Sequence, residues 1–130
     1  MTVRRVPRWM STHGAEVRTL AAGCWWDAVR VPFAPGVRAL GVLGDETGAV
    51  IRDGYGDILY WLVPPGEAAD WRLPEVQVLG HGSHVAVPPP RRTKGPGLYW
   101  HVPVAYGREC TDPAHLHAAL SAALTARPAL

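Results

Sequence analysis

Runs of alternating or continuous apolar residues predict most of the strands in this chain. Residues 58–63 (ILYWLV) are apolar or aromatic on both faces of an extended chain, which is typical of a strand that lies centrally in a sheet and is covered on two sides. Further segments of strand pattern are residues 25–31, 49–51, 74–79, 85–87 and 98–102. The last two are expected to pair as a hairpin across the loop that joins them.

Helical spacing of apolar residues predicts a short helix near the start of the chain. Residues 11–23 fit such a helix, with Ser11 or Thr12 as its N-cap and Gly23 at its end. The apolar residues that would share one face are Val17, Leu20 and Ala21. Residues 37–43 predict one or two further helical turns.

The strongest helix signal lies near the C-terminus. Thr111 or Asp112 can cap a helix whose first position is Pro113. Its apolar stripe consists of Leu116, Leu120, Ala123 and Leu124, and Pro128 would end it.

Composition favours short elements joined by turns, because the chain holds 14 Gly and 13 Pro among 130 residues. This length is that of one domain. We therefore predict an α+β fold: a single compact domain with a mostly antiparallel sheet of about five or six strands, a short N-terminal helix and a C-terminal helix. Residues 1–10 are expected to form a flexible basic lead, and residues 11–130 the domain.

Composition and charge exclude some classes of protein and mark two basic clusters. With 48% hydrophobic and 18% charged residues, the chain is neither a disordered tail nor a coiled coil. A net charge of +2 is too small to indicate nucleic-acid binding by itself. Basic residues cluster, however, at Arg4, Arg5 and Arg8 and again at Arg91, Arg92 and Lys94. Each cluster is either a solvated patch or a contact for phosphates or an acidic partner.

The expected compartment is the cytoplasm. The chain shows no signal-peptide pattern and no apolar run long enough for a membrane helix, so no membrane partner is expected. Cys24 and Cys110 are too few for a disulfide scaffold. We interpret them as reduced thiols, Cys24 being buried, with a cross-link between them as the alternative.

Few residues carry a pattern that is typical of catalysis or metal binding. His81 and His84 are three apart and could bind zinc only with a third ligand, which the sequence does not place nearby. We expect no metal and no cofactor. The acidic residues of two turns are interpreted first as turn formers, with an unrecognised metal site as the alternative; they are Asp45, Glu46, Asp53 and Asp57.

Six tryptophans are many for this length. Four of them lie in strand patterns and are expected in the core: Trp25, Trp26, Trp61 and Trp100. Trp9 and Trp71 lie in polar or loop surroundings. An exposed tryptophan there would suit a partner surface or the stacking of bases.

Part of the chain resembles a known family. The segments that carry the resemblance are residues 56–66 (GDILYWLVPPG), 76–90 (VQVLGHGSHVAVPPP) and 97–100 (GLYW). Together they resemble the second half of the N-terminal primase–polymerase domain of bifunctional replication proteins, which has an archaeo-eukaryotic primase-type fold. The Arg-rich composition and the segment WWDAVRVP also look like those of small actinobacterial proteins.

The departures from the family fall on its chemistry. The family's histidine position is Ile58 here, and its metal-binding aspartate is Gln77. An amide is a poor Mg²⁺ ligand, and an isoleucine side chain forms no hydrogen bond to phosphate. The resemblance therefore implies a degenerate, truncated scaffold, for which we expect no catalytic residues.

The expected function is a non-catalytic binding or regulatory module for a nucleotide, a nucleic acid or a protein partner. Its candidate binding residues are Arg91, Arg92, Lys94, His81, His84 and Trp71. Two alternatives stay open. One is a metal-dependent nucleotidyltransferase or hydrolase of reduced size, and the other is a purely structural protein–protein interaction subunit.

Overall fold

The computed structural model describes residues 7–10, 16–105 and 107–125. Over these residues the chain forms seven strands, two α-helices and two 3-10 turns. In chain order they are η1 (Arg8–Met10), β1 (Arg18–Ala21), β2 (Asp27–Pro32), α1 (Phe33–Leu43), η2 (Gly44–Glu46), β3 (Val50–Asp53), β4 (Ile58–Val63), β5 (Gln77–Leu79), β6 (His84–Val87), β7 (Leu98–Val102) and α2 (Pro113–Thr125). The predicted α+β class, with an antiparallel sheet and a C-terminal helix, is confirmed.

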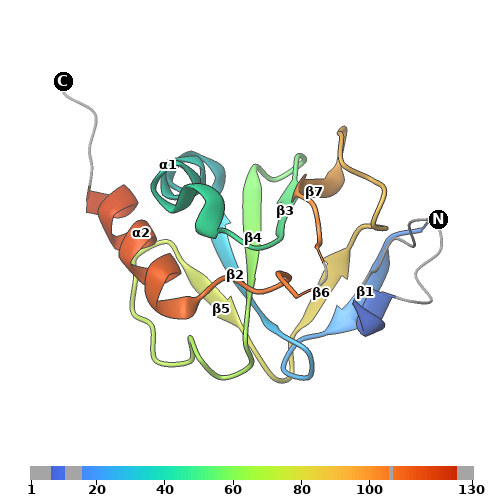
Figure 1. The fold of residues 1–130 in the computed structure, drawn as a ribbon, viewed down its shortest axis with the longest axis horizontal. Helices are drawn as coiled ribbons and strands as arrows, with labels where there is room; N and C mark the ends of the chain where they lie inside the picture. Colours follow the sequence, from blue (N-terminus) through green and yellow to red (C-terminus); the bar gives the residue numbers. More distant parts are fainter. Residues whose placement is uncertain (1–6, 11–15, 106, 126–130) are drawn as a thin grey trace.

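The strands form two antiparallel sheets. The larger has the order β5-β2-β4-β3-β7, and β1 pairs with β6 in a separate two-stranded sheet. Helices α1 and α2 lie on one side of the larger sheet, and β1 and β6 lie on the other (Figure 1). Strand β4 is therefore central and covered on both faces, as its continuous apolar pattern predicted.

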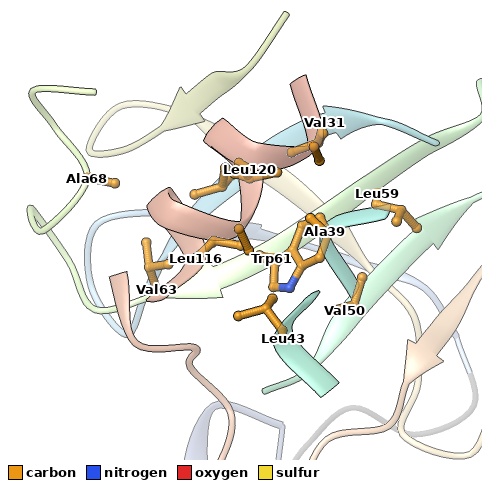
Figure 2. Close-up of a cluster of buried hydrophobic side chains, with 13 residues drawn as sticks. Val31, Ala39, Leu43, Val50, Leu59, Trp61, Val63, Ala68, Leu116 and Leu120 are labelled. Carbon is orange, nitrogen blue, oxygen red and sulfur yellow. The ribbon is translucent and has the colours of Figure 1, made fainter. Parts of the chain in front are cut away.

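The first hydrophobic cluster lies between the larger sheet and the helices. Trp61 of β4 stands at its centre, against Leu116 and Leu120 of α2 and Ala39 of α1 (Figure 2). The Trp61 indole N–H also donates to Thr47 Oγ1 at 3.1 Å. This hydrogen bond satisfies the only polar atom of the side chain, so the large ring can be buried without an unpaired donor.

The second cluster lies on the opposite face of the same sheet. Leu62 of β4 packs there with Trp26, Trp100 and Met10. Met10 is 2% exposed, and the Trp9 ring lies 5.7 Å from that of Trp26. Residues 7–10, which we assigned to the basic lead, thus pack on the domain.

The helices are positioned by caps and by contacts between them. Asp112 accepts the His115 backbone N–H at 3.0 Å, which makes it the N-cap of α2 as predicted. The Arg38 guanidinium of α1 donates to the Ala123 carbonyl of α2 through Nε and Nη2, at 3.3 and 3.1 Å. The predicted apolar stripe of α2 is buried at Leu116, Leu120 and Ala123.

Three expectations about the N-terminal half are wrong. Within the described part of the predicted helix at 11–23, Arg18–Ala21 forms strand β1, which pairs with β6. Trp25 is 50% exposed, and Cys24 is exposed, because both lie in the turn before β2. Residues 11–15 and Pro128 lie outside the described residues.

The expected hairpin between 85–87 and 98–102 is also wrong. Strand β7 pairs with β3, and β6 pairs with β1. The loop between them carries the chain from one sheet to the other.

Among the helices that the structure describes, none has the length and apolar character needed to cross a membrane.

Candidate functional site: an aromatic and basic surface beside β7

The loop that joins β6 to β7 carries the predicted basic cluster and is held in a defined shape. Arg92 folds back on it, since its Nε donates to the Leu98 carbonyl at 2.9 Å and its Nη2 to the Pro96 carbonyl at 2.6 Å. Its guanidinium is therefore used for structure. Arg91 and Lys94 are exposed, and we take them as the charges of this loop that are candidates for meeting a ligand.

Two tyrosines pack against the glycines of this loop. A Cβ added to Gly95 would stand 3.2 Å from the Tyr99 ring, and one added to Gly97 would stand 2.9 Å from the Tyr55 ring. Tyr55 comes from the turn between β3 and β4, which is tied to the loop by a 2.9 Å hydrogen bond from Gly54 N–H to the Gly97 carbonyl. Turn and loop lie at the same end of the sheet (Figure 1). Tyr55 is nonetheless 85% exposed, so one face of its ring is open.

Arg52 of β3 lies beside the same loop. Its guanidinium carbon stands 3.9 Å from the centre of the Phe33 ring, and its Nη1 donates to the Tyr99 hydroxyl at 3.2 Å. Its Nη2 is 3.6 Å from Asp57 Oδ1. The Arg52 side chain is 25% exposed, so these contacts hold a partly accessible cation in one orientation.

His101 of β7 completes this group. Its ring lies edge-on to Phe33, with the ring centres 6.5 Å apart. Burial and, to a smaller extent, the positive charge of Arg52 lower the pKa of His101, so its imidazole is neutral at neutral pH. We call these residues together the tyrosine–arginine surface: Arg52, Tyr55, Arg91, Lys94, Tyr99 and His101.

The other predicted binding residues lie elsewhere. His81 is exposed in a turn closed by a hydrogen bond from Ser83 N–H to the Gly80 carbonyl, and His84 is exposed on β6. Trp71 is half-buried with its ring 5.0 Å from that of His117 on α2. The structure thus brings Arg91 and Lys94 together with residues that the sequence analysis missed, and leaves Trp71 and the two histidines apart from them.

Of the four acidic residues interpreted as turn formers, Asp53 shows hydrogen bonds of that kind. Asp53 Oδ1 accepts the backbone N–H groups of Tyr55 and Gly56, at 3.0 and 3.4 Å. Glu46 lies 3.6 Å from His115. Within the described ranges, no three His, Cys, Asp or Glu side chains converge as metal ligands would.

The two positions at which the chain departs from the primase–polymerase pattern lie on different strands. Ile58 begins β4 and Gln77 begins β5, with β2 between the two strands. No family model, curated protein or solved structure matches the chain. The resemblance to the primase–polymerase domain therefore stays a prediction.

Proposed function

We propose that this domain is a non-catalytic binding module whose tyrosine–arginine surface binds single-stranded nucleic acid. The observation that carries the proposal is the open ring of Tyr55, 85% exposed, held against the loop of Arg91 and Lys94. Single strands are bound by aromatic rings that stack bases, beside cations that meet the phosphates. The core of a protein–protein interface usually gathers several aromatic or apolar residues, and among the described residues Tyr55 is the one exposed large apolar side chain of this surface.

Arg52, Tyr99 and His101 support the same assignment. Arg52 presents a guanidinium that is already ordered by Phe33 and Tyr99, so less side-chain entropy is lost when it meets a phosphate. The neutral His101 ring offers a second surface for stacking. Asp57 opposes binding, because its carboxylate lies 3.6 Å from Arg52 and repels phosphate.

The test is the binding of a labelled short oligothymidylate at low salt, followed by fluorescence anisotropy. Stacking on one ring contributes about 1–3 kcal/mol per base, so Tyr55→Ala should weaken binding by about 5- to 150-fold. The double variant Arg91→Gln/Lys94→Gln should lower the slope of log K against log salt by about 1.4, since each phosphate contact on a single strand contributes about 0.7. Asp57→Asn should strengthen binding.

Arg72→Gln is the matched control, because it removes one exposed charge next to Trp71, away from this surface. It should leave the affinity close to that of the wild type. Absence of binding at low salt would overturn the proposal. So would a Tyr55→Ala variant that binds like the wild type, or a loss in Arg72→Gln as large as that in the double variant.

A further inference from the structure

A buried carboxylate at the other end of the larger sheet has no charge partner among the described residues. Asp27, at the start of β2, is 4% exposed. Its Oδ2 accepts the Gly66 backbone N–H at 2.8 Å. Its Oδ1 is buried without a hydrogen-bond partner among the described residues. None of the ion pairs among the described residues includes Asp27.

This arrangement is costly unless something compensates the charge. Burying a carboxylate that forms one neutral hydrogen bond is strongly unfavourable, because water would solvate both of its oxygens. The nearby thiol of Cys110 does not compensate it. Burial, followed by the charges of Glu109 and Asp27, raises the pKa of Cys110 to about 11, so the thiol carries no charge at neutral pH.

Asp27 lines a cavity of 370 Å³. Three glycines share the lining, namely Gly23, Gly66 and Gly80, together with the apolar Pro65 and Val78. A Cβ on Gly80 would stand 3.4 Å from Asp27 Oδ2, so on that side the carboxyl group is bordered by a glycine and by no side chain. The volume lies near the lower end of the range for ligand pockets, about 300–1,000 Å³, which fits a small molecule.

We propose that this cavity binds a small organic cation with N–H donors, an alkylammonium or an alkylguanidinium, through Asp27. Such a group supplies both things that the carboxylate lacks, a positive charge and a donor for Oδ1. The apolar walls at Pro65 and Val78 suit the alkyl chain. The site involves none of the residues of the tyrosine–arginine surface. Cation binding here is therefore independent of nucleic-acid binding.

The test is an NMR titration of the ¹⁵N-labelled protein at neutral pH with n-butylammonium, n-butylguanidinium and the neutral n-butylurea. The two cations should produce saturable shifts at the amides of Gly23, Gly66 and Gly80, and the urea should not. The ratio of the two affinities tells which cation the site prefers. Equal shifts with the urea, or no saturable shift with either cation, would overturn the proposal.

Variants locate the binding site. Asp27→Asn keeps the shape and removes the charge, so it should lose binding of the cations. Gly80→Ala places a methyl group against Oδ2 and should weaken binding by about tenfold. Asp70→Asn, which neutralises an exposed carboxylate, is the control and should bind like the wild type. Should Asp27→Asn lose its circular dichroism signal, Gly80→Ala decides: wild-type affinity in that variant contradicts the proposal.

Discussion

Thr111 shows how one side chain can join three parts of this fold. It is buried, its Oγ1 accepts the Gly48 backbone N–H at 2.8 Å, and its own N–H donates to the Leu62 carbonyl at 2.8 Å. The approach to Gly48 is close, because a Cβ there would meet the Cys110 backbone at 2.8 Å. Thr111 thus fixes the start of α2 to β4 and to the segment before β3, while the neighbouring Asp112 caps the helix.

We predict that Thr111→Val lowers the free energy of unfolding by about 1–3 kcal/mol, because the buried Gly48 N–H then lacks its acceptor. Urea denaturation followed by circular dichroism measures the change. Thr125→Val, at an exposed residue of α2, should stay within about 0.5 kcal/mol of the wild type. Equal losses in the two variants would contradict the assignment of the Thr111 hydroxyl.

We predict that His101 titrates below its ordinary pKa of 6.5 when its ring proton is followed by NMR. Arg52→Met should raise its pKa only part of the way back, since burial is the larger cause and the Arg52 charge the smaller. A titration midpoint at or above 6.5 in the wild type would contradict the burial of His101 and its closeness to Arg52.

The lowered pKa of His101 also makes the stability of the fold depend on pH. The pKa of His101 is lower in the folded chain than in the unfolded one, so its contribution to stability is fully present above pH 6.5 and is lost as the pH falls through the folded pKa. The ring is partly exposed, so the loss is expected to be small. The urea midpoint of the wild type should fall more on acidification than that of His101→Phe.

At the scale of elements, α2 is held by its apolar stripe. Leu120 is fully buried against Trp61 and α1. We predict that Leu120→Ala lowers the free energy of unfolding by about 2–5 kcal/mol, the usual cost of such a truncation in a core. Val42→Ala, at a residue of α1 that is 62% exposed, should change it by less than about 0.5 kcal/mol. A loss in Leu120→Ala as small as that in Val42→Ala would mean that α2 does not cover β4.

Some elements could be predicted because their own residues specify them. Residues 58–63 have no polar face, and Asp112 with Pro113 marks the start of a helix. Strand β1 could not be predicted, because only three apolar residues lie in 17–21 and their spacing also fits a helix. Its structure comes from pairing with β6, in which Thr19 pairs with Ala86, 67 residues further along the chain. Local patterns carry no information about such pairing.

Only part of the candidate site could be predicted from the sequence, because the rest of it also depends on strand pairing. Arg91 and Lys94 stand out in the sequence because, with Arg92, they are three basic residues within four positions directly after a proline run. Arg52 and Tyr55 do not, because they join the site only through the pairing of β3 with β7, whereas the sequence suggested a hairpin of β7 with the strand before it. Trp25 was expected in the core because its turn was interpreted as part of the strand.

At the scale of the whole molecule, the two hydrophobic clusters share one sheet. Trp61 of β4 belongs to the first cluster and its neighbour Leu62 to the second. Unfolding of β4 therefore disrupts both clusters at once. We predict one cooperative unfolding transition. Indole NMR signals of Trp61 and Trp100 should disappear at the same urea concentration as the far-ultraviolet circular dichroism. Separate midpoints for the two indoles would contradict this coupling.

The pairing of distant strands also governs how the domain can form during translation. As the nascent chain leaves the ribosome, β1 stays unpaired until β6 has been synthesised. The edge of β3 that faces β7 likewise stays unpaired until β7 has been synthesised. The helix face of β4 stays bare until α2, up to Thr125, has been synthesised. The emerging polypeptide therefore exposes apolar strands until α2 has been added, and the packing of α2, rather than any early subdomain, is the step that protects these strands from aggregation.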